Sequence, residues 1–206
     1  MIGIITGDIA GSRKTTHPEN WMHPLKKFFG QLGNQPATWD IFRGDTFQLE
    51  IQNPLDSLKV ALRIKALVKS TSGLNTRMAI GIGEKEYKAE RITESNGQAF
   101  VFSGETYETL KKEGRTLAVR SPWKDFDRIL NVSLRLATVL TDSWSKTTAG
   151  YVNLRMENPD LTQVKLSELL GVSQSAISAR HTRSHRDEIM QLEELYRELL
   201  NQKINK

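Results

Sequence analysis

The strongest constraint on the fold is a single glycine near residue 171 that separates two short segments with helical patterning. Three leucines at the spacing of one helix face precede it: Leu166, Leu169 and Leu170. Gly171 stands where the chain must turn sharply, since glycine accepts positive φ at little cost. Ser173 is placed to cap a second helix, which Ala176 and Ile177 pack against the first. The pattern predicts two helices joined by a tight turn.

The second predicted helix begins with polar residues and is followed by basic ones. In a helix-turn-helix, such a helix enters the major groove and its first residues contact base edges. The residues expected to meet DNA are Ser173, Gln174, Ser175, Ser178, Arg180, His181, Arg183 and Arg186. Glutamine can pair with adenine through two hydrogen bonds, while arginines neutralise phosphates. The alternative is a plain helical hairpin with a solvated basic face.

The stretch from Leu170 to Ser178 reads L-G-V-S-Q-S-A-I-S. It resembles the helix-turn-helix of bacterial regulators and sigma-factor-like domains, matching their L-G-V-S-Q-S-A-[VI]-S pattern nearly letter for letter. The resemblance covers about 144–185. The residues spaced like the helix that braces such modules are Trp144, Ala149, Val152 and Leu154. The resemblance implies a transcriptional regulator that binds double-stranded DNA.

Past this segment, apolar residues again recur at helical spacing. They are Ile189, Leu192, Leu195, Leu199 and Leu200, with Tyr196 beside them. Paired helix-turn-helix modules usually need a dimer helix, so one expectation is a homodimer formed through this face. The other expectation is that the face packs on its own domain, and the sequence leaves both open.

The first 120 residues alternate between strand-like and helix-like segments. The predicted strands are 2–7, 38–43, 46–52, 76–83 and 116–120, and the predicted helices are 20–29, 55–69 and 97–112. Gly44 and Asp45 form the tight turn between the second and third strands. This order, β-α-β-β-α-β-α-β, predicts an α/β sandwich with helices on one face of a sheet. Ser121-Pro122 ends the alternation, so we expect an α/β domain over 1–120 and an all-α domain over 121–206.

Two carboxylates stand out in the first domain. Asp8 ends the first strand and Asp45 lies in the hairpin turn, so their side chains could converge. Paired carboxylates repel one another unless a cation is present, and their oxygens suit Mg²⁺ holding a triphosphate. Gly11 and Ser12 follow with free backbone N–H groups, and Arg13 or Lys14 is close by. The alternative is structural, because Gly-Asp pairs are common in turns.

The two carboxylate segments read I-T-G-D-I-A-G-S-R over 5–13 and F-R-G-D-T-F over 42–47. They resemble the metal-binding strand and hairpin of class III nucleotidyl cyclases, whose palm fold GGDEF domains share. With S-N-G-Q-A-F-x-x-S-G over 95–104, the chain is similar to SatD-type bacterial proteins across most of 1–120. The resemblance implies that Asp8, Asp45 and the carbonyl of Ile9 bind a metal. The nucleotide-binding residues implied are Gly11, Ser12, Arg13, Arg43 and Gly44.

The resemblance fails where cyclases place the asparagine and arginine that stabilise transition-state charge. Alignment on Gly97 puts Val101 and Glu105 at those positions, and neither can donate to a phosphate. We therefore expect a non-catalytic palm domain that senses a nucleotide with Mg²⁺. One alternative is a nucleotidyl cyclase or other Mg²⁺-dependent phosphoryl-transfer enzyme with a DNA-binding tail. Another is a palm that binds no ligand and serves only to dimerise or recruit a partner.

Composition excludes several other classes of protein. The chain has no cysteine, so disulfides, zinc fingers and thiol catalysis are absent. A formal net charge of +5 favours a polyanionic partner such as nucleic acid. The apolar N-terminus lacks a basic leader, and no apolar run approaches membrane-spanning length. We expect a cytoplasmic protein without a membrane partner.

Overall fold

The computed structural model describes residues 1–205, apart from the side chain of Lys14. Its first part contains β1 (Ile2–Ala10), α1 (Glu19–Gly30), β2 (Trp39–Phe42), β3 (Thr46–Ile51), α2 (Ser57–Ser72), β4 (Asn75–Gly83), α3 (Gln98–Glu113) and β5 (Leu117–Arg120). Its second part contains α4 (Lys124–Asp142), α5 (Lys146–Glu157), α6 (Gln163–Leu170), α7 (Gln174–Ser184) and α8 (Arg186–Ile204). The predicted order of strands and helices is confirmed, and the chain is mixed α/β.

The five strands form one sheet in the order β2-β3-β1-β4-β5. β1 lies at its centre and pairs antiparallel with both β3 and β4, while β5 pairs parallel with β4. The apolar run at the start of β1 is buried on both faces, as a central strand requires. The end of this strand, where Asp8 lies, therefore meets two neighbouring strands at once.

Helices cover both faces of the sheet, so the prediction of helices on one face is wrong. Met78, Ile80 and Ile82 of β4 point into the core beneath α1 and α2. The alternate residues Ala79 and Gly81 face α3. A Cβ on Gly81 would lie 2.1 Å from the carbonyl oxygen of Ala99, so α3 can approach this closely only over glycine. The small residues of β4 thus make room for a helix on the second face.

Two boundaries differ from the prediction for local reasons. The predicted two-residue turn at Gly44-Asp45 is a three-residue turn, in which Arg43 and Gly44 both have positive φ. The helix predicted from residue 55 begins at Ser57 instead. A short 3-10 turn over Pro54–Asp56 precedes it, and the side chain of Asn53 accepts from the backbone N–H of Leu55 at 3.2 Å.

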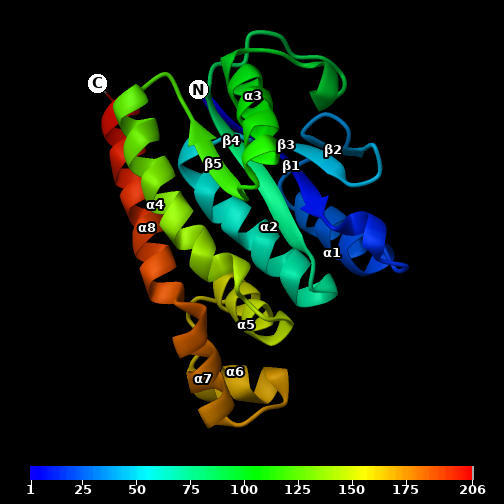
Figure 1. Ribbon diagram of the computed structural model, residues 1–206, viewed down its shortest axis with the longest axis vertical. Helices are drawn as coiled ribbons and strands as arrows, with labels where there is room; N and C mark the ends of the chain where they lie inside the picture. The colour runs from blue at the N-terminus through cyan, green and yellow to red at the C-terminus, as the bar shows by residue number, and fades with distance from the viewer. Residues whose placement is uncertain (206) are drawn as a thin grey trace.

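The helices after residue 120 share one hydrophobic core with the sheet. α4 packs against β5, α5 against α2, and α8 against α4 and the start of α2 (Figure 1). The phenol of Tyr196 in α8 donates to the carbonyl of Pro54 at 2.8 Å. Ile189, Tyr196 and Leu200 are buried in this core, whereas Leu195 is exposed. The residue-120 boundary marks a change in chain pattern, but packing continues across it.

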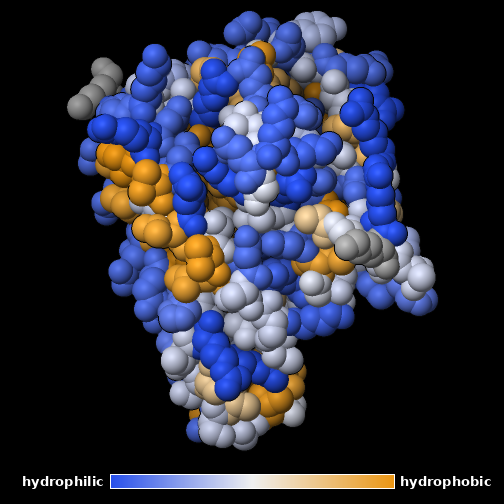
Figure 2. Space-filling view, viewed as in Figure 1, coloured by the Kyte–Doolittle hydropathy of each residue, from blue (hydrophilic) through white to orange (hydrophobic). Residues whose placement is uncertain are grey.

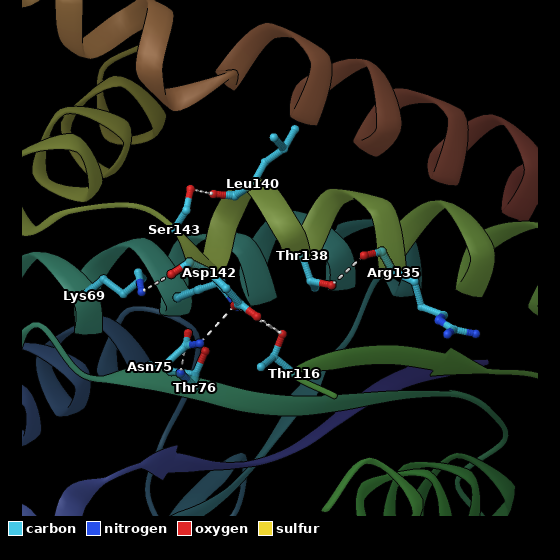
Figure 3. Close-up of polar contacts among 10 residues, drawn as sticks. Lys69, Asn75, Thr76, Thr116, Arg135, Thr138, Leu140, Asp142 and Ser143 are labelled. Carbon is cyan, nitrogen blue, oxygen red and sulfur yellow. Dashed lines mark hydrogen bonds and ion pairs between the residues drawn. The ribbon is translucent and has the colours of Figure 1, made fainter. Parts of the chain in front are cut away.

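A partly buried polar cluster joins the end of α4 to the sheet and to α2. Asp142 accepts from Asn75 Nδ2 and from Thr116 Oγ1, both at 2.9 Å (Figure 3). Its carboxylate also forms an ion pair with Lys65, which is fully buried. Lys69 donates to the Asp142 carbonyl at 2.8 Å. The last turn of α4 is therefore fixed to three other elements.

The helices α6 and α7 project from the lower end of the molecule, away from the sheet (Figure 1). The indole N–H of Trp144 donates to the carbonyl of Ser184 at 2.9 Å and holds the end of α7. The residue between α7 and α8 is His185, whose φ of 47° is left-handed. Within residues 1–205, none of the helices combines the length and apolar character needed to cross a membrane.

Candidate functional site

A cleft of about 640 Å³ opens at the end of β1, where β1, β3, β4 and α3 meet. The strand register creates it, because Asp8 lies opposite Thr46 of β3 on one side and Arg77 of β4 on the other. The hairpin turn then brings Asp45 to the same place. The cleft therefore collects residues from four segments that are distant in sequence.

Asp8 is a largely buried acid in the cleft. Its carboxylate is 15% exposed and lies 3.4 Å from Nη1 of Arg77. Burial raises the pKa of Asp8 above its ordinary value, the Arg77 charge lowers it, and Asp45 raises it further. The other carboxylate oxygen, Oδ1, is buried and has no hydrogen-bond partner among the described residues. A buried acceptor without a donor favours an additional ligand at this point.

Asp45 is held beside Asp8 by contacts from the end of β1. The backbone N–H of Ile9 donates to the Asp45 carbonyl at 3.3 Å, and Ser12 Oγ donates to its carboxylate. Gly11, which has φ 85°, makes the turn between the end of β1 and Ser12. Arg43, in the hairpin turn, has φ 52°. Left-handed backbone costs about 1–3 kcal/mol for an arginine, and such strain clusters at functional sites.

The cleft contains most of the residues expected to bind a metal or a nucleotide. These are Asp8, Ile9, Gly11, Ser12, Arg13, Arg43 and Asp45. Gly44 lines a smaller adjoining hollow of about 180 Å³, together with Arg13 and Arg43. Sequence reasoning missed Arg77 of β4 and Tyr107, Glu108 and Lys111 of α3, which also line the cleft. The i, i+4 spacing of Tyr107 and Lys111 was the available signal, since it places both on one helix face.

The charges around the cleft favour an anion. Its lining includes four basic residues, Arg13, Arg43, Arg77 and Lys111. The acidic residues are Asp8, Asp45 and Glu108. Burial raises the pKa of Tyr107 to about 12, with the Asp8 charge adding to the rise, so this phenol stays neutral and can donate a hydrogen bond. A phosphate-bearing ligand would meet basic groups and a neutral donor together.

The same cleft fits a divalent cation only in part. The Asp8 and Asp45 carboxylates and the unpartnered Oδ1 are oxygen donors of the kind Mg²⁺ prefers. Among residues 1–205, however, no group of three or more acidic, histidine or cysteine side chains is placed to hold a metal. The remaining ligands would have to be phosphate oxygens and water, so the residues fit a cation that arrives with a nucleotide.

A second candidate site is the outer face of α7. Ser173 caps this helix, its hydroxyl accepting from the N–H of Ala176 at 3.2 Å, and Gly171 makes the preceding turn with φ 62°. The residues exposed on α7 and its cap are Ser173, Gln174, Ser175, Ser178, Thr182 and Arg183. Thr182 is the one that sequence reasoning missed. Ile177 on the opposite face is buried against α5 and α6.

Two of the basic residues expected to meet DNA also make contacts within the protein. His181 Nδ1 lies 3.1 Å from the Tyr151 hydroxyl, and His181 Nε2 lies 3.4 Å from Asp187. Arg186 is 17% exposed and pairs with Asp187 at 3.3 Å. Arg180 is partly buried. Arg183 is therefore the most accessible of the basic residues expected to meet DNA.

The first helix of this pair differs from the prediction at one leucine. Leu166 is fully buried and Leu170 packs against the core, but Leu169 is 57% exposed. The helix is only eight residues long and packs mainly on α7, so its buried face is narrower than the three leucines suggested.

Searches against family models, curated proteins and solved structures found no match for this chain, so its function has to be argued from the residues of these two sites.

Proposed function

We propose that this protein is a DNA-binding transcriptional regulator with a nucleotide-sensing cleft. The observation that carries the proposal is the outer face of α7. It is capped by Ser173, preceded by a left-handed Gly171, and exposes Gln174, Ser175, Ser178 and Arg183 at the projecting end of the molecule. A helix presented in this way matches the recognition helix of a helix-turn-helix.

The chemistry of that face divides into two roles. Gln174 and Ser175 lie at the helix start, where base edges would be read, and Gln174 is the residue able to recognise adenine. Arg183 lies in the last turn and would contact phosphate, which positions the protein without selecting a sequence. The net charge of +5 supports the same partner.

The proposal is tested by selecting bound sequences from a random duplex library and measuring affinity against salt. Arg183→Ala should weaken binding to every sequence alike and reduce the salt slope by about 1. Gln174→Ala should cost about 1–3 kcal/mol on the selected site and relax the preference at one position. The matched control is Lys88→Ala, an exposed lysine in the loop before α3. A wild-type protein that binds no duplex at low salt overturns the proposal.

The cleft at the end of β1 is proposed to bind a nucleoside triphosphate with Mg²⁺, without turning it over. Strand order β2-β3-β1-β4 with two helices on one face is the ferredoxin-like arrangement on which palm domains are built, and it supports the resemblance to cyclases. Val101 and Glu105, which align with the cyclase catalytic pair, do not line the cleft, and Glu105 pairs with Arg120 at 2.5 Å. The residues that α3 places in the cleft are Tyr107, Glu108 and Lys111.

Titration calorimetry with ATP and GTP, each with and without Mg²⁺, tests this part. We expect heat from wild type that is lost in Asp8→Asn and Asp45→Asn. Asp160→Asn, at an exposed acid between α5 and α6, should bind like wild type. A palm that only dimerises or recruits a partner would give no heat that depends on Asp8 and Asp45.

An enzyme remains the second candidate, because Asp8 Oδ1 is buried without a donor and Lys111 supplies a cation beside it. Incubation with each nucleoside triphosphate and Mg²⁺ or Mn²⁺, followed by chromatography, separates the two. A product that disappears in Asp8→Asn would establish nucleotidyl transfer and replace the non-catalytic assignment.

A further inference from the structure

A band of exposed apolar side chains runs along α4 and α8 (Figure 2). On α4 it consists of Ile129, Val132, Leu136 and Val139, of which Leu136 and Val139 are each 70% exposed. Their spacing of three, four and three residues is that of a coiled-coil seam. On α8 the exposed Leu195 continues the band, with the partly buried Leu192 and Leu199 beside it. Monomeric proteins rarely leave a continuous apolar band of this kind uncovered.

Charged residues border the band on both sides, with opposite sign. At about 100° per residue, Arg128 and Arg135 fall on the flank of α4 away from α8. Figure 3 shows Arg135 extending from the side of α4 opposite Leu140, which points toward α8. Glu194 and Glu198 fall on the flank of α8 away from α4. All four side chains are exposed, and none forms an ion pair within residues 1–205.

We infer that this face binds a second copy of the chain about a two-fold axis parallel to α4 and α8. α4 and α8 run antiparallel, since Lys203 at the end of α8 pairs with Asp125 at the start of α4 at 2.6 Å. Rotation about an axis along the helices places α4 of one copy on α8 of the other. The arginine flank of α4 in each copy then lies against the glutamate flank of α8 in the other copy. The two apolar bands cover each other, and the four helices form a bundle.

A two-fold axis across the helices does not fit the charges. It would place α4 on α4 and bring the arginine edges together, and likewise the glutamate edges, which like-charge repulsion disfavours. It would also carry the projecting α6–α7 units to opposite ends of the dimer. The parallel axis keeps both units at one end, as two half-sites on one duplex require. This inference rests on the proposed function only for that last argument.

Sedimentation of the full-length chain tests the interface without DNA. Wild type should sediment as a dimer, and Leu136→Glu as a monomer, with the dissociation constant raised at least about a hundredfold. Leu169→Glu changes an exposed leucine on α6 and should remain dimeric. Leu169→Glu should keep the wild-type thermal midpoint, because exposed substitutions rarely alter folding. Leu136→Glu should match the wild type at protein concentrations low enough for the wild type to dissociate, since association itself stabilises the folded dimer. A monomeric wild type overturns the inference.

Charge reversal tests the direction of the axis. Arg128→Glu/Arg135→Glu and Glu194→Arg/Glu198→Arg should each weaken the dimer about tenfold or more, and an equimolar mixture should restore it as a heterodimer. An arginine reversal that leaves the dimer unchanged overturns the parallel axis, because a crosswise axis merely exchanges one like-charge contact for another.

DNA binding separates this inference from the proposed function. On a duplex with two half-sites, Leu136→Glu should lose at least about tenfold in affinity, and on a single half-site it should match wild type. Arg183→Ala should dimerise normally but bind both duplexes weakly. Unchanged affinity of Leu136→Glu for the paired site would overturn the interface and leave DNA binding intact.

Discussion

At the scale of single residues, Asp142 provides the carboxylate that pairs with a fully buried lysine. It is the last residue of α4 and compensates the charge of the fully buried Lys65. Burial alone would raise the pKa of Asp142, but Lys65 and the hydrogen bonds from Asn75 and Thr116 bring it below its ordinary value. Burial lowers the pKa of Lys65, which shows how costly that ammonium would be without its partner.

Asp142→Asn is expected to destabilise the protein by about 3 kcal/mol at neutral pH, because it leaves the buried Lys65 ammonium without a carboxylate and with a 3.4 Å contact to Thr116. The measurement is urea unfolding. The double variant Lys65→Met/Asp142→Asn should recover much of the loss, because it removes the charge together with its partner. A single variant as stable as wild type would contradict the role given to the pair.

The same pair predicts a dependence on acid pH. A carboxyl whose folded pKa lies below its unfolded value of 3.8 stabilises fully above that value and loses its contribution as pH falls through the folded pKa. The stability difference between wild type and Asp142→Asn should therefore shrink as the pH is lowered below about 4. A difference that stays constant down to pH 2.5 would show that Asp142 is not the titrating group.

At the scale of elements, the turn before α7 sets the position of the outer face of α7 relative to α6. Gly171 has φ 62°, and a Cβ placed there would touch nothing within 4 Å. This position therefore favours glycine because of its backbone conformation, and not because a side chain would lack space. Ser173 completes the turn by capping α7.

Gly171→Ala should cost about 1–2 kcal/mol through left-handed strain, and Ser173→Ala about 1 kcal/mol through the lost cap. Gly104 is the matched control. It lies inside α3, and a Cβ there also meets nothing within 4 Å, so Gly104→Ala should stabilise by about 0.5–1 kcal/mol. Hydrogen exchange of the α6–α7 amides measures the local effect. If these amides are protected equally in Gly171→Ala and in wild type, the role given to Gly171 is wrong.

The order of strands and helices could be predicted from the sequence because each element carries its own periodicity. Asp8 and Asp45 were found because both lie in short local motifs. Arg77 could not be found in this way, since its place in the cleft depends on strand register. The i, i+4 spacing of Tyr107 and Lys111 places both on one helix face, but which sheet face α3 covers could not be predicted from it. Apolar spacing in α8 likewise could not distinguish Tyr196, which is buried, from Leu195, which is exposed.

At the scale of the whole molecule, the cleft and the projecting helices are joined through β4. Arg77, which pairs with Asp8, is two residues from Asn75, which donates to Asp142 at the end of α4. α5 begins four residues after Asp142 and packs on α7. A ligand that separates Arg77 from Asp8 would therefore act on β4, the strand that contacts the junction between α4 and α5.

We therefore expect a nucleotide to change affinity for the selected duplex, with the coupling expected at about 1–3 kcal/mol. Gel shifts over a nucleotide series measure it. Asn75→Ala should reduce the coupling while leaving nucleotide binding in place, because it cuts the contact to Asp142 without entering the cleft. If saturating nucleotide leaves the affinity for the selected duplex unchanged, the two sites are not coupled.

The shared core has a consequence for folding. Because α4 packs on β5, and α5 and α8 pack on α2, residues 1–120 alone would expose the outer face of α2 and one side of β5. We expect the full chain to unfold in one transition by circular dichroism and by tryptophan fluorescence, and the 1–120 fragment to remain unfolded. Two separated transitions would show that the two parts fold independently.

The angle between α7 and α8 depends on the left-handed backbone of His185. One pair of backbone angles sets the direction in which α7 leaves α8, and the Trp144 contact to Ser184 fixes it from the other side. In a dimer built on α4 and α8, this peptide and the packing of α5 on α7 together set the separation of the two α7 helices. A substitution at residue 185 would then change the distance between the two α7 helices with no change to the outer face of α7.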